Sequence, residues 1–164
     1  MKKFAALLLA LMMVLPMAAM AEAVPSVSAD AFTSASTTNY YAAKALTGDA
    51  LMEAANTNAG FYLVCTVNPD GSANAAVLVF NIKKVEDKYY LQLGMAENQT
   101  KANLEATGEG LAVYAVMTAD KPYAVSGARF YFETIADQAV VDELMKDARQ
   151  GAMFYEITEI LPLG

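Results

Sequence analysis

The residues with the clearest chemical potential lie at a predicted helix start, over positions 97–101. Asn98 is a typical N-cap residue, so the pattern predicts a helix over 99–107 that ends at Gly108. The first turn of a helix presents unpaired backbone N–H groups and partial positive charge, which favour a bound phosphate. Thr100 would add a hydroxyl and Lys101 an ammonium group at this place. An ordinary capped surface helix would use the same residues, so both interpretations stay open.

Two other residues could also carry chemistry, and each has a simpler structural explanation. Arg129 lies in an apolar predicted strand, where it either points outward to solvent or meets an anion. Cys65, the only cysteine, alternates onto the same strand face as Phe61 and Leu63. We expect a buried, inert thiol, because no neighbouring residue supplies the positive charge that would activate it.

Tyrosines and carboxylates give weaker indications. Three tyrosines could stack on a planar ligand, or simply pack in a sheet: Tyr123, Tyr131 and Tyr155. The acidic residues of the last predicted helix are expected to form a solvated face: Asp142, Glu143 and Asp147. No residue can therefore be assigned as a catalytic acid or base.

The composition excludes several classes of function. The 164 residues contain no histidine, which excludes a Ser-His-Asp or Cys-His catalytic centre and a histidine-based zinc site. One cysteine allows neither an internal disulfide nor a Cys₄ metal site. With 18 acidic against 11 basic residues, the chain lacks the basic surface that a nucleic-acid partner requires. We expect no metal site, and a bound cofactor is then the simplest source of chemistry.

The N-terminus predicts export. Lys2 and Lys3 precede an uninterrupted apolar run over 4–14, and Ala19-Met20-Ala21 is an A-x-A cleavage pattern. This predicts a secretory signal peptide over 1–21 rather than a membrane anchor, because the run is shorter than the ~20 residues of a membrane span. Cleavage of 21 from 164 residues leaves 143, with nine basic and 18 acidic residues. No later run is long enough for stable membrane insertion, so we expect a secreted or cell-envelope protein.

The elements that would position these residues follow from hydrophobic patterns and turn residues. Residues 22–40, rich in Ser, Thr and Ala, predict a flexible lead-in, and 41–164 predict one domain. The expected order is a helix within 41–56 interrupted at Gly48, strands at 61–67, 75–82 and 89–94, the helix at 99–107, strands at 111–118 and 123–134, a helix from Asp137 to Gly151, and a strand at 154–161. Tight turns such as Asn68-Pro69-Asp70-Gly71 make neighbouring strands antiparallel. The order predicts a mainly β (α+β) fold, a six-stranded antiparallel split barrel of Greek-key type with two to three helices.

Three segments, in order, resemble motifs of the pyridoxamine-5′-phosphate-oxidase-like, FMN-binding split-barrel family. They are TVNPDGSAN at 66–74, QTKANL at 99–104 and YAVSGA at 123–128, and the resemblance covers residues 48–164. It implies a homodimer with FMN at the subunit interface. It also implies that Gln99, Thr100 and Lys101 bind the cofactor, the last two at its phosphate. Residues of the second strand would pass near the flavin: Asn74, Ala75, Ala76 and Val77.

The sequence departs from the oxidases of that family at two places. The second strand reads Asn74-Ala75-Ala76-Val77 where oxidases carry a phosphate-binding arginine. The substrate-binding Arg and His residues of the oxidase C-terminus have no counterpart. We therefore do not expect a role in pyridoxine metabolism.

A second resemblance lies in the lead-in. Residues 30–38, DAFTSASTT, are similar to the signature at which FMN transferases attach FMN covalently to exported redox proteins. The resemblance implies that Ser36 is the acceptor hydroxyl and Asp30 a recognition residue. A plain Ser/Thr-rich linker is the alternative interpretation.

These observations support two main hypotheses of function. The first is an exported FMN-binding protein, a possible FMN-dependent oxidoreductase acting on an unknown small molecule. The second is a non-catalytic split-barrel binding module that has lost the flavin. Haem in the same barrel is a third, less favoured hypothesis, because only Tyr, Met or Cys could then serve as axial ligands.

Overall fold

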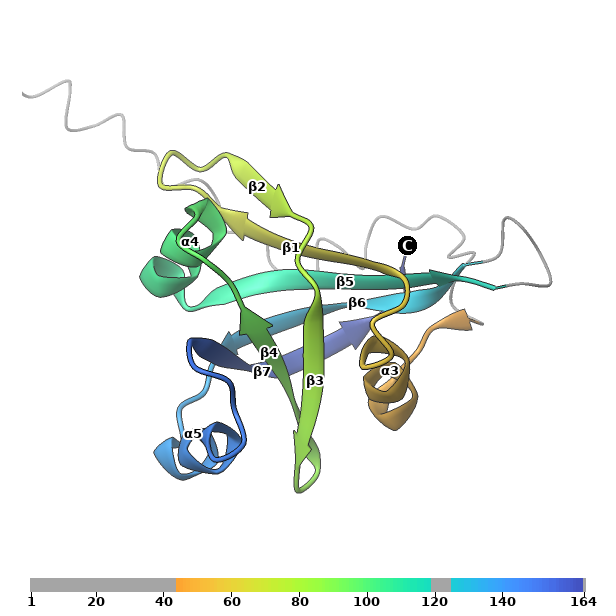
Figure 1. Ribbon diagram of the computed structural model, residues 1–164. Helices are drawn as coiled ribbons and strands as arrows, with labels where there is room; N and C mark the ends of the chain where they lie inside the picture. The colour runs from red at the N-terminus through yellow and green to blue at the C-terminus, as the bar shows by residue number, and fades with distance from the viewer. Residues whose placement is uncertain (1–43, 119–124, 164) are drawn as a thin grey trace, which may run out of the picture. The chain divides into compact units, whose positions relative to one another are not determined.

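The β-rich part of the chain folds into one antiparallel sheet of seven strands (Figure 1). The structure, a computed structural model, describes residues 44–118 and 125–163. The predicted signal peptide, the lead-in with Asp30 and Ser36, and Tyr123 lie outside the described residues. The strands are β1 (Phe61–Val67), β2 (Ala73–Ala76), β3 (Phe80–Val85), β4 (Lys88–Gly94), β5 (Glu109–Met117), β6 (Val125–Thr134) and β7 (Ala152–Leu161). Their order in the sheet is β2-β1-β5-β6-β7-β4-β3.

The predicted fold class is confirmed as α+β with an antiparallel sheet, but the number of strands differs. The sequence predicted one strand over 75–82, and the structure has two in its place, β2 and β3. β2 pairs with β1 as far as Ala76, whereas β3 pairs with β4 from Phe80 onward. The three residues between them connect the two outer strands of the sheet, so the sheet curls without closing by hydrogen bonds. This path leaves Val77 82% exposed.

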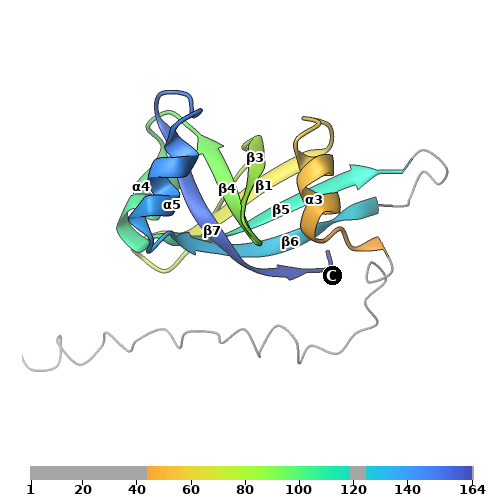
Figure 2. The ribbon, with the colours of Figure 1, turned by 90° about the horizontal axis from the view of Figure 1, so that it is seen from below.

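Three helices accompany the sheet: α3 (Gly48–Ala55), α4 (Gln99–Thr107) and α5 (Gln138–Met145). Figures 1 and 2 agree that α4 and α5 lie toward one end of the sheet and α3 toward the other. The bounds of α4 match the prediction. α3 begins at Gly48, with a φ of 54°, so this glycine starts the helix rather than interrupting it. α5 stops at Met145, short of the predicted end near Gly151.

Alternating burial along β1 builds one side of the core. Tyr62 and Val64 point inward, and the ring of Tyr62 meets Phe80 edge-on with centroids 5.0 Å apart. The Tyr62 hydroxyl donates to the Ala55 carbonyl at 2.6 Å, and this carbonyl at the end of α3 also accepts from the Asn58 N–H at 3.4 Å. None of the described helices is long and apolar enough to span a membrane.

Candidate functional site

The predicted helix start is formed as the sequence indicated. Asn98 Oδ1 accepts a hydrogen bond from the backbone N–H of Lys101 at 2.9 Å. At the other end Gly108 adopts a φ of 74° and donates its N–H to the Leu104 carbonyl at 2.8 Å. The cap leaves the N–H groups of Gln99 and Thr100 without an acceptor among the described residues.

A network of amides and hydroxyls joins α4 to the β1–β2 hairpin. Asn74 Nδ2, on β2, donates to Thr100 Oγ1 at 2.9 Å and to Thr66 Oγ1 at 3.1 Å. Two predicted site residues 26 positions apart are therefore in direct contact. Thr100 is only 2% exposed, so its hydroxyl faces this network and not solvent.

Asn103 extends the network and was not predicted as a site residue. Its Nδ2 donates to Thr66 Oγ1 and to Asn68 Oδ1, both at 2.9 Å. Its Oδ1 accepts from Gln99 Nε2 at 2.7 Å. A buried asparagine within a helix is unusual, because its side chain competes with helical hydrogen bonds. An asparagine inside a predicted helix is the sequence feature that could have drawn attention to Asn103, although it does not reveal the partner.

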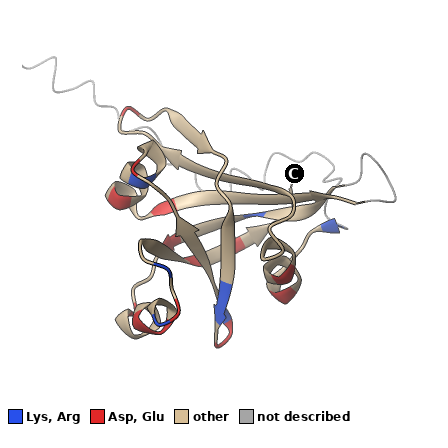
Figure 3. Cartoon of the chain, viewed as in Figure 1, with Lys and Arg blue, Asp and Glu red and all other residues tan. Residues whose placement is uncertain are grey.

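Lys101 is held between two carboxylates of its own segment. Its ammonium group pairs with Glu97 and lies 3.6 Å from Glu105 Oε1. The hydrogen bond to Glu97 raises the pKa of Lys101 above its ordinary value. Acidic and basic positions lie together on α4 in Figure 3. An anion at this helix start must therefore compete with Glu97 for the lysine.

The other predicted residues of the second strand do not all lie on the same face of β2. Ala76 shares a face with Asn74, whereas Ala75 alternates to the opposite face and is exposed. Val77 lies beyond β2. The structure thus brings Asn74 together with Gln99 and Thr100 through the hydrogen-bond network, and it leaves Ala75 on the other side of the strand.

The sheet face turned away from the core is mostly apolar. We call it the outer face, and its apolar members on β1, β5, β6 and β7 are Phe61, Leu63, Cys65, Leu111, Val113, Ala115, Met117, Val125 and Leu161. By the same registers it also carries Arg129 and Tyr131 and the carboxylates of Glu109, Glu133 and Glu159. Cys65 shares this face with Phe61 and Leu63, as predicted, but is half-buried instead of fully buried. Partial burial raises the pKa of its thiol, which keeps it protonated and inert.

Arg129 lies on the outer face but is only partly exposed, so it does not point freely into solvent as one of the two predicted alternatives required. It lies between Val113 and Leu161 in the register of the sheet. Its Nε atom is buried and has no hydrogen-bond partner among the described residues. A buried donor without an acceptor is costly, so this atom indicates a missing partner.

Tyr155 packs in the core. Its ring centroid lies 5.2 Å from that of Phe132, and burial raises its pKa to about 12. It is therefore a packing residue and not a stacking platform. In the described part of the chain, no three acidic, cysteine or histidine side chains are placed to hold a metal ion.

Comparison with solved structures identifies the fold. An FMN-binding protein from Syntrophomonas wolfei subsp. wolfei superposes with a TM-score of 0.51 at 20% identity, over 70% of this chain and 84% of that one. HupZ of Group A Streptococcus superposes with a TM-score of 0.46 at 16% identity, over 71% of this chain and 94% of that one. A Lactobacillus delbrueckii protein provisionally assigned as a pyridoxamine 5′-phosphate oxidase superposes with a TM-score of 0.44 at 15% identity. The match covers 71% of this chain and 93% of that one.

The chain thus shares its fold with the FMN-binding protein of Syntrophomonas wolfei, in agreement with the family that its motifs resemble. No protein-family model matches the sequence, and no curated protein matches it.

Proposed function

We propose that this protein binds FMN, with the phosphate at the start of α4. The observation that carries the proposal is the 2.9 Å hydrogen bond between Asn74 and Thr100. It joins the two segments, on β2 and α4, that the family resemblance assigns to one cofactor. The fold shared with the FMN-binding protein of Syntrophomonas wolfei supports the same conclusion.

The residues at the start of α4 are of the types that bind a phosphate. The N–H groups of Gln99 and Thr100 and the ammonium group of Lys101 are donors at the positive end of a helix. The polar network behind them fixes α4 against the β1–β2 hairpin, so these donors keep their positions. Bound FMN would supply electron transfer, and the chain's own residues would bind and orient it. A redox or reductase role on a small molecule follows from this proposal.

A homodimer through the outer face is part of the proposal. In a sheet with one face in solvent, outward positions are ordinarily polar, whereas here they are mostly apolar and Phe61 is 68% exposed. An acceptor from a second copy would also satisfy the buried Nε of Arg129. These two features favour a second copy of this chain as the occupant.

Export and covalent attachment are proposed from the sequence alone. Positions 1–21 have the pattern of a signal peptide, and Ser36 lies in a segment similar to a flavin-attachment signature. An exported chain would leave the cytoplasm without its cofactor, and a covalent link would then prevent its loss by dilution.

A non-catalytic module that has lost the flavin is the second candidate. The pairing of Lys101 with Glu97 and Glu105 favours this second candidate. The two carboxylates neutralise the positive charge of the lysine, which would otherwise attract a phosphate. The two candidates differ in whether Lys101 contributes to a ligand.

The deciding experiment is flavin retention by the purified protein. The proposal predicts flavin absorption and fluorescence after isolation or after incubation with FMN and dialysis. Flavin fluorescence on a denaturing gel would separate covalent from reversible binding. Lys101→Ala should weaken retention, whereas Lys146→Ala, which removes a lysine paired with Glu143 on α5, should not. A colourless protein that takes up no FMN would overturn the proposal in favour of the second candidate.

A further inference from the structure

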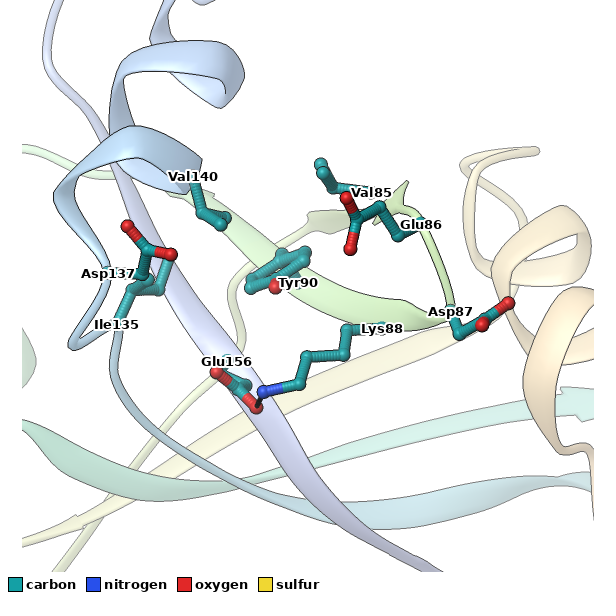
Figure 4. A pocket seen from close by; sticks show the side chains of 9 residues that line it. All are labelled: Val85, Glu86, Asp87, Lys88, Tyr90, Ile135, Asp137, Val140 and Glu156. Atoms are coloured by element: carbon teal, nitrogen blue, oxygen red, sulfur yellow. Dashed lines mark hydrogen bonds and ion pairs between the residues drawn. The ribbon is translucent and has the colours of Figure 1, made fainter.

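A pocket of about 250 Å³ opens between the β3–β4 hairpin and the start of α5, and it shares no residue with the α4 site. Its apolar wall consists of Val85, Ile135 and Val140, with the ring of Tyr90 among them (Figure 4). This volume suits a small molecule with a short apolar body.

Tyr90 is the most buried residue of this pocket. It is only 2% exposed, and its ring lines the space together with the apolar side chains. Figure 4 shows its ring inside the circle of lining side chains, between Val140 and Glu156. A tyrosine hydroxyl can donate and accept a hydrogen bond, and Tyr90 lines the pocket, so it can offer both its ring and its oxygen to a ligand there.

The charges around Tyr90 are predominantly negative. Glu156 lies directly opposite Tyr90 in the sheet, and the carboxylates of Glu86, Asp87 and Asp137 also line the pocket. The only cation that lines it, Lys88, pairs with Glu156 at 2.6 Å. Burial and then the charge of Glu156 raise the pKa of Tyr90, with smaller contributions from Glu86 and Asp137. These carboxylates therefore act on the space that the hydroxyl faces.

We propose that this pocket binds a small organic cation, a primary ammonium group on a short apolar or aromatic body. The apolar wall would cover the body, and the ammonium would lie over the Tyr90 ring and donate to its oxygen and to Glu86 and Asp137. The described carboxylates do not form a three-ligand metal site, which favours an extended organic cation over a metal ion. The proposal goes beyond flavin binding and does not depend on it.

Three probes of similar size test the charge requirement: benzylammonium, the neutral benzyl alcohol and the anionic benzoate. Each is titrated into the purified protein and followed by amide chemical shifts in heteronuclear NMR spectra. We expect saturable shifts with benzylammonium that centre on Tyr90, Asp137 and Val140, and affinity at least about tenfold lower for the other two probes. Equal binding of benzyl alcohol, shifts centred elsewhere, or no saturable binding of benzylammonium would overturn the proposal.

Variants that keep the shape of a side chain but remove its charge test the contribution of the two carboxylates. Glu86→Gln and Asp137→Asn each remove one charge, and asparagine can still cap α5 as Asp137 does through its bond to Ala139 N–H. Each should weaken benzylammonium binding about threefold to fivefold. Asp147→Asn is the matched control, since Asp147 is exposed and is not among the residues that line the pocket. Equal effects of all three variants would show a nonspecific charge effect and would contradict the site.

Discussion

At the scale of single residues, the charge state around Lys101 decides whether the α4 site can hold a phosphate. Glu97 and Glu105 stand four residues before and after it, a spacing that places all three on one helix side. The lysine side chain is 22% exposed, whereas that of Glu97 is 86% exposed. Because the exposed carboxylate can move into solvent, a phosphate can replace it at the ammonium group.

Replacing Glu97 should therefore improve FMN binding. Glu97→Gln removes the competing charge and keeps the side-chain length, so we expect FMN affinity to rise about twofold to fivefold in a fluorescence titration. Glu143→Gln, which frees Lys146 in the same way on α5, is the control and should leave affinity unchanged. An unchanged or lower affinity in Glu97→Gln would show that Lys101 does not meet the phosphate.

Tyr155 should make stability fall at alkaline pH. Its folded pKa of about 12 lies above the ordinary value of 10.0, so the unfolded chain loses this proton first. Its contribution is complete below pH 10.0 and is lost as the pH rises towards 12, by up to about 3 kcal/mol. Urea unfolding across this range should show a steeper loss for the wild type than for Tyr155→Phe. Parallel pH profiles for the two proteins would contradict the assignment.

At the scale of elements, the hydroxyl of Thr66 connects β1 with both β2 and α4. It accepts from Asn74 and from Asn103, and the residue is 5% exposed. Thr66→Val keeps the shape but deprives two amide donors of an acceptor, so we expect a loss of about 1–3 kcal/mol in the free energy of unfolding.

The control for this substitution is Thr57→Val. Thr57 is exposed, and its hydroxyl donates to the Ala54 carbonyl, which also accepts from the Tyr114 hydroxyl. The carbonyl keeps a partner in this variant, so the loss should be clearly smaller. Equal losses in urea titrations of the two variants would mean that the network does not hold the elements together.

The elements that the sequence predicted well are those whose ends are marked by capping or turn residues. Asn98 and Gly108 bound α4, and Pro69 with Gly71 bound the turn after β1, where Gly71 has a φ of 82°. The break at residues 77–79 was missed because Val77, Leu78 and Val79 continue a strand-like pattern. Here the change of strand partner, from β1 to β4, overrides local propensity.

The candidate site was predictable in part for the same reason. The helix start and its contact with the second strand were indicated by caps and motifs. The ion pairs of Lys101 could have been expected from the spacing of Glu97 and Glu105, since positions four apart face each other on a helix. The contact of Asn103 with Thr66 joins residues 37 positions apart, which no local pattern reveals.

At the scale of the whole molecule, the outer face should govern association. Phe61→Lys places a charge on this face at a position 68% exposed and should convert the proposed dimer to a monomer in sedimentation experiments. Met145→Lys is the control, because Met145 is 46% exposed on α5, away from the outer face. A wild-type protein that stays monomeric at all concentrations, or a Phe61→Lys variant that remains dimeric, would contradict the proposed interface.

The central claim is that the start of α4 binds the phosphate of FMN, and the comparison of FMN with riboflavin tests it most directly. Riboflavin carries the same ring system without the phosphate, so the ratio of the two affinities isolates the contribution of the α4 site. We predict that FMN binds at least about tenfold more tightly than riboflavin, because charge-assisted hydrogen bonds contribute to FMN alone. Lys101→Ala should reduce this ratio. Equal affinities for the two flavins, or no binding of either, would contradict the account.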